Sequence, residues 1–422
     1  MSFLYDLIAI GIFLFYLPIY LIKGKLHRGF WMRFGFLPKG LSLNQAIWIH
    51  AVSVGEAMVA KGLIQKLKES FPKKPFVLST VTVTGNKVIQ RFAQKDDFVT
   101  YLPLDLSFIV KKFLRKINPV ILVILETEIW PNLIFYLSKR DIPIVVVNGR
   151  ISDRSYKGYM IIRPLVKEVF KRINLFCVQS QTDAQRLINL GVDKERIKIT
   201  GNMKFDLGDY LKLKEEPYGV GLRLGLKPQE RLWIAGSTHP GEEGIVLEVY
   251  RNLLKDYPSL KLLIAPRHPE RSPQIERLIL RFGFNPLRLT QIAQKDKIES
   301  NTVFILDTVG ELMNYYAIAE VVFVGGSLVK RGGHNILEPA FLEKPILFGP
   351  YMFNFKDIVD LFLKEKAAIL VYNKIDLKDK LRNLLGNLKI KEDLSKRARD
   401  LVIKNQGVTL RNLEYILKIL KR

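Results

Sequence analysis

The amino-acid sequence predicts an α/β protein with two doubly wound parallel-sheet domains behind an N-terminal apolar helix. From about residue 45, short β-branched apolar runs alternate with amphipathic stretches, the pattern of strands buried on both faces of a parallel sheet. Glycine, proline and charged residues interrupt this alternation at 207–230, and a second series of apolar runs follows. One longer apolar run, residues 3–22, precedes both series.

Residues 1–22 form the first predicted element, a membrane anchor. Its apolar run holds one charged residue, Asp6, and about 20 apolar residues suffice to cross a bilayer as a helix. No Lys or Arg precedes the run, whereas Lys23 and Lys25 follow it, so the positive-inside rule places the rest of the chain in the cytoplasm. Pro18 would kink or tilt a spanning helix, and a shallow helix in the membrane interface is the alternative.

Residues 23–42 form a basic, aromatic segment beside this anchor. Between residues 23 and 41 the sequence has five Lys or Arg and no acid. Four aromatic residues interleave with them: Phe30, Trp31, Phe34 and Phe36. Because anionic lipid attracts Lys and Arg and aromatic rings settle at the headgroup level, the segment is predicted to contact an anionic membrane surface.

Residues 43–206 are predicted to form the first domain. A helix that begins near Glu56 places Val59, Leu63 and Leu67 on one apolar stripe. Its predicted strands are the apolar runs 47–53, 75–82, 98–104, 119–125, 142–148, 175–180 and 196–200.

Residues 207–230 are predicted to be a linker, and residues 231–422 a second domain of the same class. Its predicted strands are the runs 232–237, 260–266, 302–307, 321–326, 345–349 and 367–372. The charged part after about residue 375 is predicted to be mostly helical. In open parallel sheets ligands bind beyond the carboxyl ends of the strands, so the loops at those ends are the candidate sites.

Composition limits the functional classes. The 422 residues include 66 Lys plus Arg and 41 Asp plus Glu, so the formal net charge is 66 − 41 = +25. This charge implies an anionic partner: nucleic acid, an acidic membrane or a phosphorylated substrate. A hydrophobic fraction of 48% excludes a mostly disordered chain. One cysteine, Cys177, excludes a disulfide framework.

Carboxylates follow two predicted strands of the first domain. Glu56 comes after Ser53 and Gly55 in a strand–helix turn, where it could act as a general base or simply complement the helix dipole. Glu126 and Glu128 follow a run of seven apolar residues. Acids at the end of a buried strand are costly unless they are paired or functional, so a structural salt bridge is the alternative here.

Polar and cationic residues follow two predicted strands of the second domain. Ser237 and Thr238 could contact a ligand or cap a helix. Arg267 and His268 lie between prolines, whose rigid flanks would fix cationic donors in place. The sequence shows neither an HExxH metal motif nor the G-x-x-x-x-G-K-[ST] motif of P-loop phosphotransfer.

A glycine-rich loop follows a later strand of the second domain. Glycines at 325–326 and 332–333 could let backbone N–H groups approach a phosphate. Just after them, Asn335 and Glu338 would lie on nearly the same helix face. Four of the five histidines of the chain also fall in strand-end loops: His50, His239, His268 and His334.

Eight motifs in order carry a resemblance to a known family. They are WIHAVSVGE (48–56), ETEIWPN (126–132), NGRIS (148–152), GNMKFD (201–206), GSTHPGEE (236–243), PRHPER (266–271), GEL (310–312) and FVGGSLVKRGGHNILEPA (323–340). Together they resemble the 3-deoxy-D-manno-oct-2-ulosonic acid (Kdo) transferases of lipopolysaccharide biosynthesis, over nearly the whole chain. The sequence departs from the family pattern at Lys330, Arg331 and Ile336.

This resemblance implies a GT-B glycosyltransferase, in which two Rossmann-like doubly wound domains face a cleft. It implies transfer of Kdo from CMP-Kdo to a lipid A precursor, lipid IVA, with inversion at the anomeric carbon. Glu56 would be the catalytic base, and no metal or other cofactor would take part. The enzyme would work at the inner membrane, in contact with its anionic lipid, with both domains on the cytoplasmic face.

The resemblance also implies binding residues. Those for the donor are Lys204, Ser237, Arg267, His268, Gly310, Glu311, Leu312, Gly333, Asn335 and Glu338. Those for the acceptor are Arg33, Ser53, Gly55 and Glu126.

Two other functions are alternatives. A UDP-sugar transferase or a sugar-nucleotide epimerase could share the GT-B fold, and binding of CMP but not UDP would separate a Kdo transferase from them. A membrane-tethered protein that binds nucleic acid would use the positive charge. Residues 1–200 carry +16 of that charge (30 basic minus 14 acidic), partly beside the apolar run, which favours a membrane and a phosphate-bearing lipid over nucleic acid. No motif sets the oligomeric state.

Overall fold

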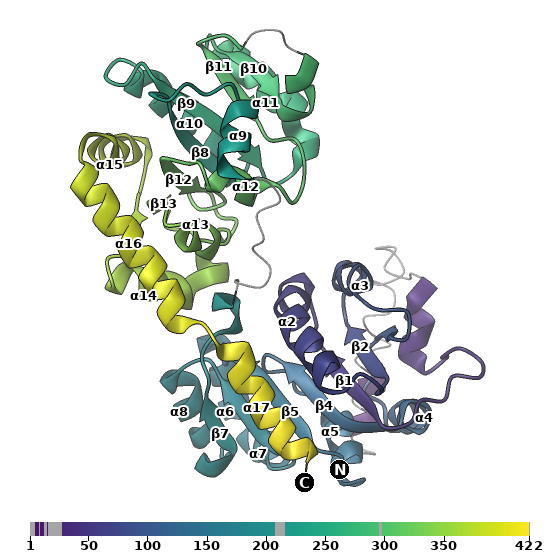
Figure 1. Ribbon diagram of the computed structural model, residues 1–422. Coiled ribbons are helices and arrows are strands. Elements are labelled where there is room, and N and C mark those ends of the chain that lie inside the picture. The colour runs from purple at the N-terminus through teal and green to yellow at the C-terminus, as the bar shows by residue number, and fades with distance from the viewer. Residues whose placement is uncertain are drawn as a thin grey trace. The chain divides into compact units, whose positions relative to one another are not determined.

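The computed structural model describes residues 5–7, 9–11, 15, 28–206, 216–294 and 298–421. The chain forms two compact units, Met1–Asp206 with Gly407–Arg422, and Leu207–Gln406 (Figure 1). Each unit contains one seven-stranded sheet. The predicted pair of parallel-sheet α/β domains is therefore confirmed.

The first sheet has the strand order β3-β2-β1-β4-β5-β6-β7, and every neighbouring pair is parallel. Its strands are β1 (Ala46–His50), β2 (Phe76–Thr80), β3 (Phe98–Tyr101), β4 (Pro119–Leu125), β5 (Ile144–Gly149), β6 (Leu175–Val178) and β7 (Ile197–Ile199). All of the strands predicted for this unit are present. Their apolar residues are buried because helices cover both faces of the sheet.

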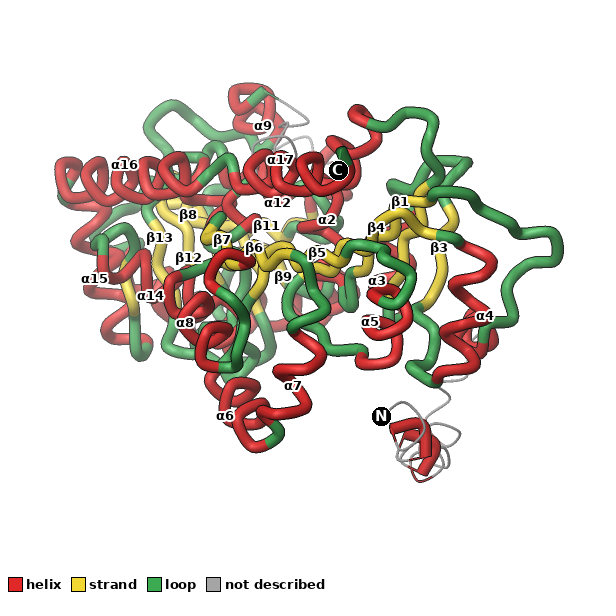
Figure 2. Tube along the Cα trace, turned by 90° about the horizontal axis from the view of Figure 1, so that it is seen from below, coloured by secondary structure: helices red, strands yellow, loops and turns green. Residues whose placement is uncertain are grey.

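The helices of the first unit divide between these two faces. One face holds α4 (Ser107–Ile117), α5 (Pro131–Ser138), α7 (Arg163–Phe170) and α8 (Gln181–Asn189), with α6 (Asp153–Ile161) leading into α7. The other holds α2 (Val54–Ser70), α3 (Val83–Gln90) and α17 (Val408–Leu420). Figure 2 shows α2 and α17 on one side of the strands and α5 and α7 on the other. Leu63 and Leu67 of α2 are buried, as the apolar stripe predicts.

The second sheet has the strand order β10-β11-β9-β8-β12-β13-β14 and is also parallel. Its strands are β8 (Arg231–Thr238), β9 (Leu260–Pro266), β10 (Asn285–Arg288), β11 (Thr302–Ile305), β12 (Val321–Val324), β13 (Ile346–Phe348) and β14 (Ile369–Leu370). The sequence did not predict β10, whose NPLR segment is polar and contains Pro286. Proline is tolerated there because β10 lies at the sheet edge.

The helices of the second unit are α9 (Pro217–Arg223), α10 (Glu242–Leu253), α11 (Ser272–Arg281), α12 (Leu312–Tyr316), α13 (Leu337–Phe341), α14 (Lys356–Lys364), α15 (Lys374–Gly386) and α16 (Leu388–Asn405). Part of the predicted linker 207–230 is thus folded. Val220 of α9 and the following Leu224 are buried, and residues 216–230 belong to the second unit.

The last helix returns to the first unit. The Asp206 carboxylate accepts hydrogen bonds from the backbone N–H groups of Gly407 (2.7 Å) and Val408 (3.2 Å), and also from that of Thr409. A carboxylate at a helix N-terminus satisfies N–H groups that have no partner within the helix. The last segment of the chain therefore groups with residues 1–206, whereas the sequence-based division placed it in the second domain.

The predicted anchor lies mostly outside the described residues. Within the described parts of the chain, no helix is both long and apolar enough to cross a membrane. Asp6 Oδ1 accepts hydrogen bonds from the Ser107 N–H (3.0 Å) and from Asn132 Nδ2 (2.7 Å), which ties residue 6 to α4 and α5. In the basic, aromatic segment, η1 (Arg28–Phe34) is a 3₁₀ helix, and the side chains of Trp31 and Phe36 are exposed.

Candidate active site

Glu56 lies at the carboxyl end of the first sheet, in the first turn of α2. The Val52 N–H donates a hydrogen bond of 2.7 Å to its Oε2, and the Ser53 hydroxyl donates one of 3.0 Å to its Oε1. Ser53 is the N-cap of α2, but its side chain does not cap the helix. Both carboxylate oxygens of Glu56 are therefore held in a fixed orientation beside the strand end.

Two further carboxylates lie close enough to act on Glu56. Burial, and then the negative charges of Glu126 and Glu128, raise the pKa of Glu56 to about 7, although the two hydrogen bonds lower it. Burial and the charge of Glu126 also raise the pKa of Glu128. A carboxyl group whose pKa lies near neutral pH is suited to accept and release a proton.

Glu126 follows β4 directly and has a φ of +59°, a left-handed backbone that is uncommon outside glycine. Its N–H donates a hydrogen bond of 2.9 Å to the Val147 carbonyl. In the part of the chain that the structure describes, neither Glu126 nor Glu128 forms an ion pair. The salt bridge considered as an alternative is therefore not seen there.

Three further residues predicted for the site belong to the first unit: Gly55, Arg33 and Lys204. Gly55 faces open space, with no atom within 4 Å of a Cβ placed there. Arg33 Nε donates a hydrogen bond of 3.3 Å to the Leu102 carbonyl, after β3. Lys204 lies in η3 (Met203–Phe205), whose first N–H donates to Asn148 Oδ1 (2.9 Å) in β5.

His50 is a core residue rather than part of a strand-end loop. It is the last residue of β1 and is completely buried. Its Nδ1 lies 2.9 Å from the Ser79 hydroxyl. Burial, and to a lesser degree the charge of Arg33, lower the pKa of His50 to about 3, so this ring is neutral at physiological pH.

In the second unit, Ser237 interrupts β8 near its carboxyl end. The pairing of β8 with β9 shifts register between Gly236 and Thr238, and Ser237 has a φ of +56°. Such a bulge re-aims the side chain. The Thr238 hydroxyl donates to Glu243 Oε1 (3.0 Å), and the N-cap of α10 is Gly241, so neither Ser237 nor Thr238 caps this helix.

Arg267 and His268 form the turn after β9. The Arg267 N–H donates a hydrogen bond of 3.0 Å to the Thr238 carbonyl, which fixes the turn to β8. The Arg267 side chain is exposed, and its guanidinium has no hydrogen-bond or ion-pair partner among the residues described. The exposed His268 ring lies 3.3 Å from Glu270 Oε1. An unpartnered guanidinium thus lies at the carboxyl end of the second sheet.

Two short segments complete this edge of the second sheet. Gly310 has a φ of +88° and precedes Glu311, the N-cap of α12. Asn335 Nδ2 donates a hydrogen bond of 3.1 Å to Glu338 Oε1, so the two side chains meet as expected, although Asn335 precedes α13 rather than lying on its face. Asn335 Oδ1 accepts from the Leu337 N–H (3.1 Å), and burial raises the pKa of Glu338.

The glycine-rich loop is occupied by a carboxylate of the protein itself. Glu242, completely buried at the start of α10, accepts hydrogen bonds from the N–H groups of Gly326 (2.7 Å), Ser327 (2.9 Å) and Leu328 (2.9 Å). The Gly333 N–H donates to the Gly326 carbonyl (2.8 Å). The prediction that these N–H groups approach a phosphate is therefore wrong for Gly326 and Gly333.

Comparison with known proteins decides which family shares these motifs. A family model described as 3-deoxy-D-manno-octulosonic-acid transferase (kdotransferase) matches residues 28–207. The 3-deoxy-D-manno-octulosonic acid transferase of Haemophilus influenzae is 36% identical over 90% of this chain and 88% of its own length. That of Chlamydophila psittaci is 33% identical over 87% of this chain and 85% of its own length. The chain belongs to the Kdo transferase family.

As a Kdo transferase, the chain is a glycosyltransferase that adds Kdo in lipopolysaccharide biosynthesis. A solved structure of UDP-GlcNAc 2-epimerase from Neisseria meningitidis bound to UDP-GlcNAc has a TM-score of 0.61 and covers 89% of this chain and 100% of its own. Its identity is only 14%, so this likeness shows the fold alone. The two parallel-sheet α/β domains therefore resemble those of GT-B neighbours, and the likeness gives no support to the epimerase alternative.

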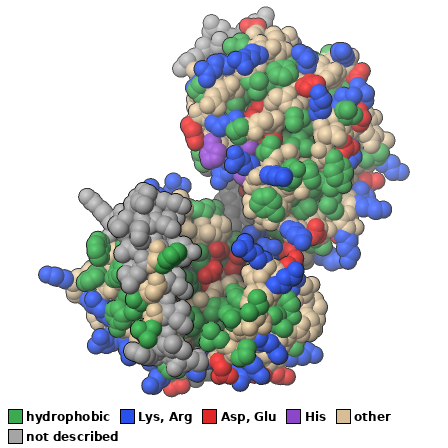
Figure 3. Space-filling view, turned by 180° about the vertical axis from the view of Figure 1, so that it is seen from behind, with side chains coloured by type: hydrophobic (Ala, Val, Ile, Leu, Met, Phe, Trp, Pro, Cys, Tyr) green, Lys and Arg blue, Asp and Glu red, His purple; other side chains and the backbone are tan. Residues whose placement is uncertain are grey.

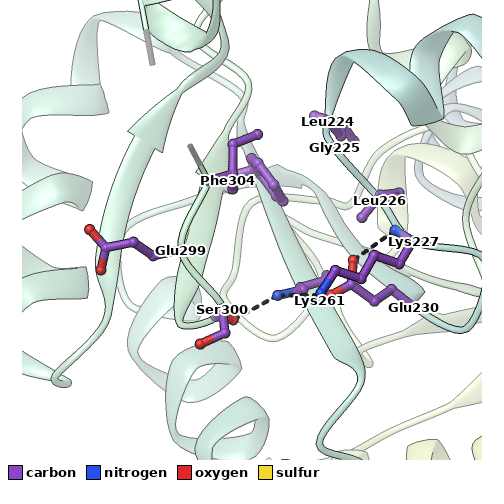
Figure 4. A pocket seen from close by; sticks show the side chains of 10 residues that line it. Leu224, Gly225, Leu226, Lys227, Glu230, Lys261, Glu299, Ser300 and Phe304 are labelled. Carbon is purple, nitrogen blue, oxygen red and sulfur yellow. Dashed lines mark hydrogen bonds and ion pairs between the residues drawn. The ribbon is translucent and has the colours of Figure 1, made fainter. Parts of the chain in front are cut away.

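One pocket of this Kdo transferase lies away from the motif residues. It has a volume of about 390 Å³ and lies where β8, β9 and β11 begin (Figure 4). This is the end of the strands opposite to the motif residues. Within it Lys261 Nζ lies 3.3 Å from Glu230 Oε1 and donates to the Ser300 carbonyl at 2.7 Å. Because these charges satisfy one another, the pocket is not the candidate site.

The sequence did not predict one feature of the candidate site, the direct contact of His239 with His334. Their Nε2 atoms lie 2.9 Å apart. The concentration of histidines in strand-end loops was the signal that could have suggested it.

Proposed function

We propose that this Kdo transferase moves Kdo from CMP-Kdo to the glucosamine disaccharide of lipid IVA, with inversion at the anomeric carbon. The observation that carries the proposal is Glu56. This half-buried carboxylate ends the WIHAVSVGE motif, is fixed by two hydrogen bonds and has its pKa raised to about 7 by burial and neighbouring acids.

Glu56 acts as the general base of this reaction. Its carboxylate takes the proton of the attacking sugar hydroxyl while that oxygen bonds to the anomeric carbon of Kdo. The bond between that carbon and the phosphate oxygen breaks, and its electron pair leaves with CMP. Glu56 then releases the proton to solvent. Ser53, Gly55, Glu126 and Arg33 bind the acceptor.

The second unit binds the donor nucleotide. Arg267 contacts the phosphate or the cytidine, supported by its lack of a partner among the described residues, since charge-assisted bonds to phosphate are strong. The backbone of 310–312 contacts the base, Glu338 the ribose hydroxyls and Asn335 the phosphate. Ser237 and His268 complete this site, and Lys204 adds positive charge near the linker.

The enzyme works at the cytoplasmic face of the inner membrane, where its lipid acceptor lies. Residues 3–22 act as the anchor. Trp31 and Phe36 expose their rings within the basic segment 23–42, and such a combination suits the headgroup layer of anionic lipid.

Glu56→Ala tests this proposal. Wild type and variant are incubated with CMP-Kdo and the tetra-acylated lipid A precursor, products are identified by mass spectrometry, and Kd values are measured for CMP and UDP. We expect the wild type to add Kdo and to bind CMP but not UDP. The variant forms no product yet binds CMP normally, because the base acts on the acceptor. Near-normal turnover in the variant, or equal affinity for UDP, contradicts the proposal.

A further inference from the structure

Two histidines of the second unit lie head to head at the carboxyl ends of neighbouring strands. His239 follows β8, and His334 lies in the loop after β12, which pairs with β8. Their ring planes differ by 3°, their centroids lie 5.2 Å apart and their Nε2 atoms 2.9 Å apart. Since one nitrogen must donate and the other accept, one proton lies between the two rings.

The backbone, rather than this hydrogen bond alone, holds the two rings together. Gly326 has a φ of +67° and lies under both: a Cβ there would come within 3.0 Å of His334 Nε2 and 3.2 Å of His239 Cδ2. The buried Glu242 accepts from the N–H groups of His239 (2.9 Å) and Gly326 (2.7 Å), so it joins the two loops. The pair is therefore a fixed element of the site.

The outer nitrogens of the pair are available to a ligand. Among the residues described, neither His239 Nδ1 nor His334 Nδ1 has a hydrogen-bond partner. In the neutral pair one Nδ1 carries a proton and the other does not. A pair that gains one proton has an N–H at each Nδ1 and one positive charge. Figure 3 shows histidine side chains at the surface of this unit, next to Lys or Arg side chains.

The surroundings keep the pair neutral until an anion arrives. Burial, and then Arg267, His239 and His268, lower the pKa of His334 to about 4. Burial, His268, Arg331 and Arg271 lower the pKa of His239, which Glu243 raises. The charged or titratable groups that face the His239–His334 pair are Glu242, Glu243, Arg267, His268, Arg271 and Arg331.

The acids among these groups are already occupied. Glu242 accepts backbone N–H groups, and Glu243 Oε1 accepts from Arg271 (2.8 Å) and the Thr238 hydroxyl (3.0 Å). The exposed Arg267 guanidinium instead has no partner among the described residues. Glu338 lies near enough for the charge of Arg267 to lower its pKa, but it forms no ion pair with Arg267 among the described residues. A guanidinium and imidazole nitrogens without hydrogen-bond partners there fit a phosphate monoester, which has two negative charges and several acceptor oxygens above its second pKa of about 6.

We propose that the His239–His334 pair binds the phosphate of the cytidine nucleotide and takes up one proton from solvent when that phosphate occupies the site. The inference rests on the proposed function, since CMP is the nucleotide released. The bound phosphate raises the proton affinity of the pair, so by linkage a falling pH strengthens CMP binding, by at most tenfold per pH unit for one proton.

The test measures the Kd of CMP and of cytidine between pH 6.5 and 8.5 with the full chain, in wild type, His239→Gln and His334→Gln. We expect wild type to bind CMP at least tenfold more tightly at pH 6.5 than at pH 8.5, while the Kd of cytidine changes less than twofold. Each glutamine variant loses this pH dependence and binds CMP at least fivefold more weakly at pH 6.5. A pH-independent CMP affinity in wild type, or the same dependence in the variants, overturns the proposal.

Nuclear magnetic resonance of the imidazole Cε1–H groups provides a test that needs no folded variant, because the chain has only five histidines. Saturating CMP should raise the titration midpoint of the pair to about pH 7.5 or above, the value that a tenfold change in affinity between pH 6.5 and 8.5 requires for one proton, and cytidine should leave it unchanged. An unchanged midpoint with CMP overturns the proposal. Absence of CMP binding at every pH would instead overturn the donor assignment itself, and this inference with it.

Discussion

The carboxyl edges of the two sheets have opposite electrical character. At the first, Glu126 and Glu128 raise the pKa of Glu56, and no ion pair joins Glu126 or Glu128 to the described residues. At the second, the Arg267 guanidinium is unpartnered in the described structure, and the buried Glu242 is fully used by backbone N–H groups. The first edge therefore suits a proton acceptor, and the second suits an anion.

This difference shows that residues in the strand-end loops, and not the sheets themselves, determine which chemistry each unit can perform. Both sheets are parallel and seven-stranded. Like charges held together cost stability, because each disfavours the ionised form of the other. Glu126 and Glu128 lie without an ion pair beside Glu56 in the described structure, whereas Glu242 and Glu243 at the second edge are held by N–H groups and Arg271. Acids grouped in this way at the first edge are a feature that function explains and packing does not.

The largest effect expected is that of Glu56→Gln, which removes the base and keeps the shape. We expect kcat to fall by about 10²–10⁴-fold, while the Kd of CMP stays within twofold of wild type. Steady-state kinetics and calorimetry measure the two quantities. Glu69→Gln, at the exposed end of the same helix, is the control and should leave both unchanged. A similar loss in both variants would show that α2, rather than the carboxylate, had been damaged.

Local sequence pattern was enough to predict most of the fold. Buried strands such as β4, with PVILVIL, are recognised by uninterrupted apolar residues. The edge strand β10 carries no such run, because it pairs with a neighbouring strand on one side only and is therefore less buried. The sequence predicts linker rather than helix α9 because Gly219 and Gly221 weaken the helical pattern, and packing of Val220 compensates for this.

The candidate site was predicted where partners are close in sequence. Glu56 with Ser53, and Asn335 with Glu338, are three residues apart, so the turn at the start of each helix brings them together. Glu242 binds the N–H of Gly326 across 84 residues, and His239 meets His334 across 95. Such contacts depend on β8 and β12 being neighbours, which local patterns do not reveal.

Arg267→Ala should give the next largest effect and should act on the donor. Loss of a charge-assisted hydrogen bond costs about 1.5–3 kcal/mol, so we expect the Kd of CMP to rise roughly 10- to 100-fold. Calorimetric titration with CMP measures this. Arg277→Ala removes an exposed arginine of α11 and should bind CMP normally. If both variants weaken binding equally, the effect is one of general charge and not of the Arg267 position.

Glu242→Gln tests whether the carboxylate in the glycine-rich loop is structural. The amide nitrogen cannot accept a hydrogen bond, so at least one buried N–H loses its acceptor, at a cost of about 2 kcal/mol in the free energy of unfolding. Urea unfolding measures this change. Glu248→Gln, on a less buried position of α10, should be nearly neutral. An equally stable Glu242→Gln protein would mean that water or a rearranged loop satisfies these N–H groups.

Whatever Glu126→Gln does to the plateau of kcat/KM through its contact with the acceptor, the smallest effect expected is a displaced pH profile. Glu56 is a base only when ionised, so kcat/KM should rise with pH and level off above about 7. Removing the charge of Glu126 favours the ionised form of Glu56 and so lowers the pKa of Glu56. The rise of kcat/KM at low pH, the acid limb of the profile, then moves to lower pH. The displacement should be less than one pH unit, because burial is the main cause of the raised pKa. Glu168→Gln, exposed on α7, should not move the limb. An acid limb that stays in place with Glu126→Gln would mean that burial alone sets the pKa of Glu56, and the acids of this edge would then need another explanation.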